Sequence, residues 1–257
     1  MENHKISLSR RGWLRFASLG VPLSMAAAPG EAAVPATFPT QPPDLVREMV
    51  TVAHGNFGRV RELVEDRPSL AKASWDWGFG DWEDALGAAS HTGNREIAEY
   101  LLGHGARPTL FSATMLGQLE VVKAFVAAQS GAQRIAGPHG ISLLAHAKAG
   151  GAKAEAVLRY LEELGDAGST PVVPLSAEDL GALAGTYVFG DGPAERIEVT
   201  ASGAQLLFTR TGMMGRPLYH LGDRVFYPAG ASAVRIRFAG TVLTVHDPGL
   251  VLTARRI

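Results

Sequence analysis

The chain has 257 residues, which is enough for one large domain or two small ones that each bury a core. Hydrophobic residues make up 46% and charged residues 19%, and the formal net charge is -1, as in an ordinary globular protein. Basic runs that would bind a phosphate backbone are missing after the first residues, so nucleic acid is not an expected partner. The chain contains no cysteine, which excludes disulfides, cysteine nucleophiles, thiolate zinc sites and a lipid-modified cysteine anchor.

The first residues are typical of an export signal rather than of a folded core. In "SRRGWLRF" (9–16) two adjacent arginines precede an aromatic residue, a leucine and a third arginine, and a short apolar run follows. This stretch resembles a twin-arginine export signal, which implies removal of residues 1–36 and a periplasmic or secreted location. A disordered basic N-terminus is the alternative. The apolar run is too short to span a membrane, so no stable span is expected after signal removal.

A proline-rich leader is predicted over residues 37–43, and helical periodicity dominates residues 44–166. Three stretches in the helical part share a glycine, a polar residue and apolar residues at matching offsets. They are "HGNFGRVRELV" (54–64), "TGNREIAEYLL" (92–102) and "LGQLEVVKAFV" (116–126). Glycine between two helices supplies the left-handed backbone of a sharp turn. A single helix pair of this kind cannot bury its apolar ridge, so the units are expected to stack.

These units resemble the ankyrin repeat, most closely in "DALGAASHTGNREIAEYLLGHGA" (84–106), and a weaker fourth unit covers 140–165. The resemblance implies an ankyrin-like α-solenoid of about four helix pairs with a concave binding face. The matched glycines Gly55, Gly93 and Gly117 are 38 and 24 residues apart, against a usual period of about 33. The first unit is therefore expected to carry an extended projecting loop, here called the finger, and the second unit to have lost its own.

The finger, "WDWGFGDWED" (75–84), holds three of the four tryptophans beside several carboxylates. Tryptophan is enriched at binding hot spots, and an acidic aromatic surface favours cationic or ring-stacking ligands. The alternative is that the rings pack to hold down a long loop, with Asp84 capping the next helix. The candidate binding residues are Trp75, Asp76, Trp77, Phe79, Asp81, Trp82, Glu83, His91 and His139.

Histidines in the repeat region raise the question of a metal site. Those considered are His91, His104, His139 and His146. Neither a His-x-x-x-His nor a His-Glu-x-x-His spacing occurs, so neither a metal ion nor another cofactor is expected. In ankyrin-type units histidines commonly hydrogen-bond loop backbone, and the resemblance implies that role for His91 and His146.

Motifs of known catalytic sites give no convincing match. "SLAK" (69–72) fits the Ser-x-x-Lys element of penicillin-recognising serine enzymes, but it falls where the chain leaves a predicted helix. Short motifs of this kind often occur by chance. The chain contains no Gly-x-Ser-x-Gly elbow, phosphate-binding loop or dinucleotide fingerprint, so the protein is not expected to be an enzyme.

Glycine and proline in residues 167–176 predict a linker, and residues 177–257 hold about eight short β-type runs separated by turn signals. "VRIRF" (234–238) alternates apolar and charged residues, as a half-buried strand does. A small antiparallel barrel or sandwich is predicted. "LAGTYVFG" (183–190) and "DRVFYP" (223–228) resemble the small β domain appended to serine hydrolases of the β-lactamase type, which implies an accessory role.

Together these patterns predict an exported α + β protein with its helices and strands in separate domains. We expect it to bind a protein or peptide partner through the concave face and the finger, without catalysis, an expectation that depends on the fold resemblance. One alternative is a periplasmic binder of a sugar or cation, with the tryptophans or the barrel interior as its site. A second is a hydrolase of cell-envelope material.

Overall fold

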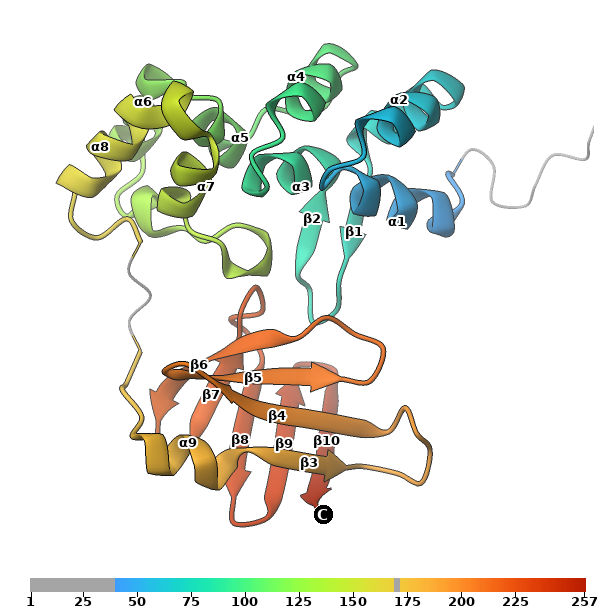
Figure 1. Cartoon of the computed structure of the whole chain (residues 1–257), viewed down its shortest axis with the longest axis vertical. Helices are drawn as coiled ribbons and strands as arrows, with labels where there is room; N and C mark the ends of the chain where they lie inside the picture. Colours follow the sequence, from blue (N-terminus) through green and yellow to red (C-terminus); the bar gives the residue numbers. More distant parts are fainter. Residues whose placement is uncertain (1–39, 169–171) are drawn as a thin grey trace, which may run out of the picture. The chain divides into compact units, whose positions relative to one another are not determined.

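The computed structural model describes residues 40–168 and 172–257, so the expected export signal and most of the proline-rich leader lie outside the described residues. Helices come first in the described chain, and a closed antiparallel β-barrel follows them (Figure 1). Residues 41–257 form one compact unit. Among the residues that the structure describes, no helix combines the length and the apolar character needed to cross a membrane.

Within residues 40–168 the structure shows four helix pairs. They are α1 (Pro43–Val52) with α2 (Phe57–Asp66), α3 (Ala85–His91) with α4 (Arg95–Gly103), α5 (Leu110–Met115) with α6 (Leu119–Ala128), and α7 (Leu143–Ala149) with α8 (Glu155–Glu163). The first helices of successive pairs pack against one another, α1 on α3, α3 on α5 and α5 on α7. Small buried residues such as Ala88, Ala89 and Ala113 allow this close approach. The C-terminal ends of neighbouring first helices therefore lie near each other.

Glycines make two of the turns between paired helices possible. Gly93 and Gly117 have φ angles of 76° and 77°, in the left-handed region where other residues are strained. At Gly117 an added Cβ would also collide with the carbonyl oxygen of Lys153, so the glycine lets the next unit approach. The first unit differs, because Gly55 does not have a positive φ and the turn there is made without a left-handed glycine.

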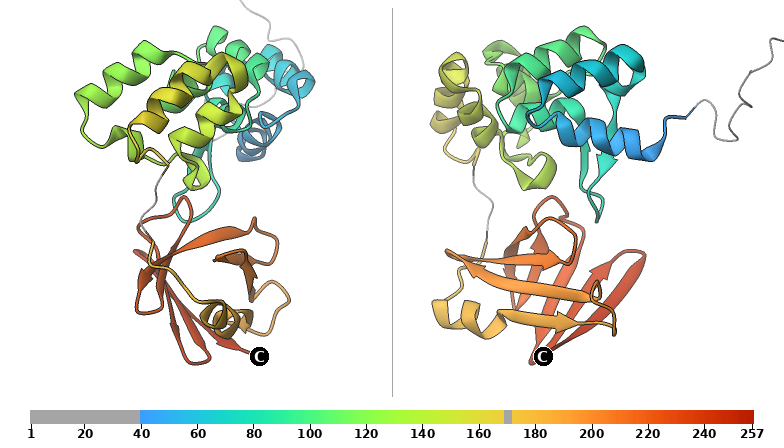
Figure 2. Two further views of the ribbon diagram at one scale, coloured as in Figure 1. Left: turned by 60° about the vertical axis from the view of Figure 1, so that its left-hand side comes forward. Right: turned by 45° about the vertical axis from the view of Figure 1, so that its right-hand side comes forward.

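Short 3-10 helices and a hairpin join the helix pairs. The 3-10 helices are η2 (Pro68–Lys72), η3 (Ala132–Arg134), η4 (Pro138–Gly140) and η5 (Gly151–Ala154). Between η2 and α3 the chain forms strands β1 (Ser74–Asp76) and β2 (Trp82–Asp84), which pair antiparallel. This hairpin is the finger, and it extends away from the helices in both views of Figure 2. Asp84 caps α3 by accepting a hydrogen bond from the Gly87 amide, as predicted.

A short helix, α9 (Ala177–Leu183), precedes the barrel, which closes in the order β10-β3-β4-β5-β6-β7-β8-β9. The strands are β3 (Gly185–Val188), β4 (Arg196–Ser202), β5 (Gln205–Arg210), β6 (Arg216–Gly222), β7 (Val225–Pro228), β8 (Arg235–Ala239), β9 (Val242–Asp247) and β10 (Leu250–Arg256). Ile236 and Phe238 are buried while Arg235 and Arg237 are exposed, which confirms the predicted alternation. Of the two predicted architectures, the β region is thus a closed barrel and not an open sandwich.

Candidate metal centre

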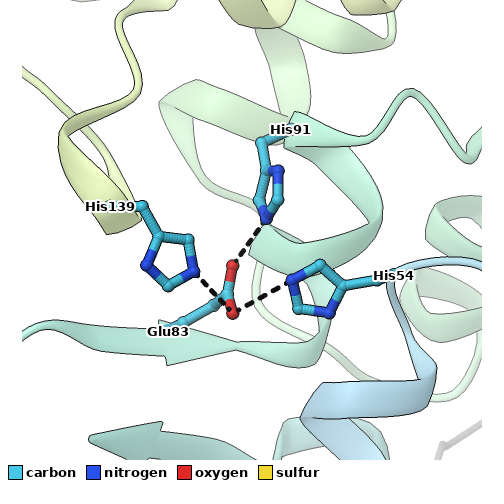
Figure 3. A group of neighbouring side chains, drawn as sticks. All are labelled: His54, Glu83, His91 and His139. Carbon is cyan, nitrogen blue, oxygen red and sulfur yellow. Dashed lines mark ion pairs between the residues drawn. The ribbon is translucent and has the colours of Figure 1, made fainter. Parts of the chain in front are cut away.

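Four side chains from four separate elements converge beside the base of the finger (Figure 3). His54 lies just after α1, Glu83 on β2, His91 at the end of α3 and His139 in η4. Each offers one ligand atom, and these atoms all lie within 4.8 Å of one another. The Glu83 side chain is fully buried, those of His91 and His139 are 11% and 15% exposed, and that of His54 is 32% exposed, so the group is shielded on all sides but that of His54.

The three imidazoles all turn their Nε2 atoms toward the Glu83 carboxylate. His91 Nε2 lies 2.9 Å from Glu83 Oε1, and the Nε2 atoms of His139 and His54 lie 3.3 and 3.5 Å from Glu83 Oε2. A zinc ion about 2.1 Å from each of four tetrahedral ligands keeps those ligand atoms about 3.4 Å apart. The distances from the three imidazoles to Glu83 are close to that value, and all four ligand atoms lie within 4.8 Å of one another, which is close enough for one ion to bind them after small movements.

Hydrogen bonds at the other ring nitrogens orient two of the imidazoles. His54 Nδ1 lies 3.0 Å from the Val50 carbonyl oxygen, and His139 Nδ1 lies 2.9 Å from Asp81 Oδ2. Both oxygens only accept, so Nδ1 carries the proton and a neutral ring leaves Nε2 free to bind a metal. A metal-binding imidazole usually donates a hydrogen bond from its other ring nitrogen to a carboxylate or a carbonyl oxygen, as His139 does to Asp81.

Two buried polar atoms at the centre of the group lack a hydrogen-bond partner. They are Glu83 Oε1 and His91 Nε2, which are close in distance but not aligned for a hydrogen bond. Glu83 Oε2, by contrast, accepts a hydrogen bond of 2.8 Å from Trp77 Nε1. Because an unpaired buried polar atom is costly, an ion bound between Oε1 and Nε2 would satisfy both.

Without a metal ion the cluster is a charged network. Burial opposes the ionisation of Glu83, but its interactions with His139 and His91 outweigh burial and lower its pKa to about 2. Burial likewise opposes protonation of His139, but Asp81 and Glu83 together raise its pKa to about 9. At neutral pH a metal ion would therefore replace a proton on His139 Nε2.

Asp81 connects this cluster to the barrel. It is 2% exposed, and its carboxylate accepts hydrogen bonds from the His139 amide and from His139 Nδ1. Arg216 of β6 donates to Asp81 Oδ2 at 2.7 Å and also donates to the carbonyl oxygens of Trp77, Gly78 and Ala229. Burial opposes ionisation, yet His139 and Arg216 hold the pKa of Asp81 below its usual range. His139 has a φ of 59°, a strained conformation that the two bonds to Asp81 stabilise.

The structure gives different environments to the aromatic residues of the finger. Trp75 and Trp77 are half-buried and pack against the apolar core of the first two helix pairs. Phe79 packs against the barrel, with its ring 6.4 Å from that of Phe208. Trp82 is 62% exposed. Trp75, Trp77 and Phe79 thus have packing partners, and Trp82 is the most exposed of the three finger tryptophans.

Two substitutions distinguish a tryptophan that packs in the fold from one that lies in solvent. Trp82→Ala is expected to change the free energy of unfolding by no more than about 0.5 kcal/mol, because the ring is largely in solvent. Trp77→Ala is expected to cost about 3 kcal/mol, because it removes aromatic packing and the hydrogen bond to buried Glu83. Urea unfolding followed by circular dichroism checks both values. Equal losses in the two variants would contradict this difference.

Of the sequence-based candidates, Glu83, His91 and His139 come together in the cluster, with Asp81 and Trp77 bonded to its members. Asp76 instead accepts a hydrogen bond from the Gly78 amide. His54 and Arg216 are missing from the sequence-based candidates. The position of His54 offers a signal, since it follows the first helix of its unit as His91 ends the first helix of the next.

His146 lies behind the cluster and behaves as a core histidine. It is fully buried, with its ring 6.4 Å from that of His91, and its Nδ1 lies 2.8 Å from the Ser142 carbonyl oxygen. This backbone contact fits the role that the ankyrin resemblance implies for His146, whereas His91 faces Glu83 instead. Burial lowers the pKa of His146 to about 4.

The low pKa of His146 predicts a loss of stability in mild acid. The unfolded chain takes up this proton near pH 6.5 and the folded chain only near pH 4, so stability falls as the pH drops through that interval. We expect a loss of about 3 kcal/mol, which His146→Phe should remove because Phe cannot take up a proton. Urea unfolding at pH 7, 6, 5 and 4 measures it. An unchanged pH dependence in the variant would refute the assignment, and exposed His104→Gln is the control.

No family model matches this chain, and neither the curated proteins nor the solved structures compared with it give a match.

Proposed function

We propose that the protein binds a divalent transition-metal ion through the Nε2 atoms of His54, His91 and His139 and a carboxylate oxygen of Glu83. The observation that carries this proposal is the convergence of three imidazole nitrogens on one buried carboxylate. A structural ion pair would need only one cation for Glu83. Here three imidazoles surround Glu83, and Oε1 and His91 Nε2 remain without hydrogen bonds.

The donor set indicates which ions would bind. Imidazole nitrogens suit zinc, copper, iron and nickel, whereas magnesium and calcium prefer oxygen ligands. Three imidazoles and one carboxylate occupy four positions, so an ion that accepts five or six ligands keeps positions for water or substrate. In such a site the ion acts as a Lewis acid.

The resemblance to ankyrin repeats supports the finger as part of the binding site. An ankyrin-type stack is supported by the left-handed glycines Gly93 and Gly117 and by first helices that pack in succession. In such a stack the projecting loop is a binding element, and here that loop supplies Glu83 and the supporting Asp81. An exported location, implied by the resemblance of the first residues to a twin-arginine signal, would place the site in the periplasm.

A protein-binding role is the second candidate. It is favoured by Trp82, whose side chain stays 62% exposed at the edge of the finger although large rings are usually covered. The Trp82→Ala variant tests it in a pull-down from periplasmic extract, since loss of a captured protein without loss of stability supports a partner surface.

Metal titration of the full chain tests the proposed centre. After removal of metal by a chelator, we expect one zinc ion per chain by calorimetry, a cobalt complex with visible absorption, and no binding of magnesium or calcium. His91→Gln and His139→Gln should weaken zinc binding about 100-fold or more, since even a supporting residue is worth 10- to 100-fold. His104→Gln is the matched control, because His104 is exposed and hydrogen-bonds only its own helix.

Zinc binding that is equally strong in the His91→Gln and His104→Gln variants would overturn the proposal, as would the absence of zinc binding in the parent chain. Circular dichroism of each metal-free variant checks that the loss does not come from unfolding.

A further inference from the structure

A pocket of about 370 Å³ lies directly beside the metal centre. Its wall includes His54 and His139, which are also members of the cluster. The pocket therefore gives a small molecule a path to an ion held by these two residues. Its volume lies within the range of about 300–1,000 Å³ that is typical of ligand sites.

Aromatic and thioether side chains supply most of the remaining wall. Trp75 and Trp77 come from the finger, and Met213 and Met214 come from the loop between β5 and β6. The two methionines are 49% and 53% exposed, which is unusual for large apolar side chains. A ligand lying between the tryptophans and the methionines would bury apolar surface on both sides.

The apolar space continues past Trp77 and the methionines. A second pocket, of about 210 Å³, shares Trp77, Met213 and Met214 with the first and adds the rings of Phe79 and Phe208, with Arg210, Arg216 and Asp247 as the charged part of its wall. An apolar group that enters beside the metal centre thus has room to extend along the finger.

The charged groups of the pocket wall indicate which polar group the ligand carries. Arg47 lines the first pocket, and it forms no ion pair with any carboxylate in the described part of the chain. The Asp76 carboxylate accepts from the Gly78 amide, and Asp81 is neutralised by Arg216. A divalent ion on Glu83 leaves one positive charge and Arg47 adds a second, against the single negative charge of Asp76, so the pocket wall as a whole favours an anion.

We propose that this pocket binds a small carboxylate with an apolar, aromatic body, its carboxylate between Arg47 and the metal ion and its body against Trp75, Trp77 and the two methionines. This inference rests on the proposed metal centre. The bound ion would then interact directly with the carboxylate of the ligand. Arg47 would favour anions over neutral molecules of the same shape.

Three probes of one shape test the inference on the zinc-loaded full chain. They are 3-phenylpropionate, the neutral 3-phenylpropanol and the cationic 3-phenylpropylamine. We expect 3-phenylpropionate to quench tryptophan fluorescence at concentrations about 10-fold lower than the alcohol, the size of effect that one charge-assisted contact gives. It should also shift the visible absorption of the cobalt-loaded chain, because it enters the coordination sphere.

Arg47→Gln should reduce this preference for the carboxylate and leave zinc binding unchanged, since Arg47 is not a metal ligand. Arg159→Gln is the control, because Arg159 is exposed on α8 and lies outside both pockets. Equal affinity for the three probes, or equal effects of the two substitutions, would overturn the inference while leaving the metal centre in place. Failure of the parent chain to bind zinc in the same preparation would overturn the metal centre, and the inference with it.

Discussion

Replacing Arg216 by methionine is expected to lower the free energy of unfolding by about 3 kcal/mol or more, since it removes one of the two cationic partners, Arg216 and His139, of the buried Asp81 carboxylate. Arg216 is 6% exposed and Asp81 2% exposed, and the bond between them is 2.7 Å long. The guanidinium also donates to the Trp77 and Gly78 carbonyl oxygens, so the variant loses contacts to the finger as well. Methionine retains much of the apolar volume, which limits the loss from packing. Urea unfolding at pH 7 measures the change.

A double substitution separates the charge effect from the packing effect. Asp81→Asn in the Arg216→Met background removes the buried charge that Arg216 no longer neutralises, so the double variant should recover at least about 1 kcal/mol relative to Arg216→Met alone. Arg237→Met is the control, because Arg237 is exposed on β8, and it should change stability by no more than about 0.5 kcal/mol. If the double variant is less stable than Arg216→Met, the buried charge is not the cause.

Arg216→Met should also weaken zinc binding about 10- to 100-fold, the usual effect of losing an outer support of a metal ligand. Asp81 orients His139 through two hydrogen bonds, and Arg216 in turn holds Asp81. Arg216 is thus a positioning residue. The cobalt absorption spectrum should change in shape, because the His139 ring turns, and a purely structural role for Arg216 would leave that spectrum unchanged.

Glu83→Gln is expected to have the largest effect on metal binding, a loss of more than about 100-fold, because it removes the only carboxylate ligand from the centre. Glutamine keeps the shape of the side chain and can still accept the hydrogen bond from Trp77 Nε1. The fold should therefore persist. Calorimetric titration with zinc measures the affinity directly.

Thermal unfolding gives a second measurement of the same loss. Zinc at 100 times its Kd should stabilise the parent chain by about 2.7 kcal/mol, whereas the Glu83→Gln variant should be stabilised by no more than about 0.4 kcal/mol at that concentration. Glu96→Gln is the matched control, since Glu96 is exposed in the first turn of α4. Retention of the zinc-induced shift in Glu83→Gln would exclude Glu83 as a ligand.

Local patterns in the sequence predicted many features of the fold. The 3.6-residue period and the turn glycines predicted helices on both sides of Gly93 and Gly117, and the structure has them. The sequence also predicts the cap at Asp84 and the alternation at Ile236 and Phe238, because each of these features depends on residues a few positions apart. The choice between barrel and sandwich was left open, since closure depends on β10 pairing with β3, more than sixty residues away.

The candidate site was predicted only in part, for a related reason. Metal motifs are recognised by short spacings on one helix, but the ligands here lie 29, 8 and 48 residues apart along the chain. His54 and His91 meet because α1 and α3 pack side by side, and His139 reaches them from η4. The concentration of tryptophan and carboxylate in the finger marked the right segment. Composition could not show that Glu83 faces inward while Trp82 faces solvent.

By itself, then, the sequence determined the order of helices and strands, the long finger between the first two units and the residues that cap or turn the chain. These features depend on interactions between near neighbours, which the order of residues specifies directly. Only the tertiary structure decided that three histidines surround Glu83 and that Arg216 of the barrel holds Asp81. Such contacts arise when separate elements bury their apolar faces against each other, and that packing brings distant polar groups within bonding distance.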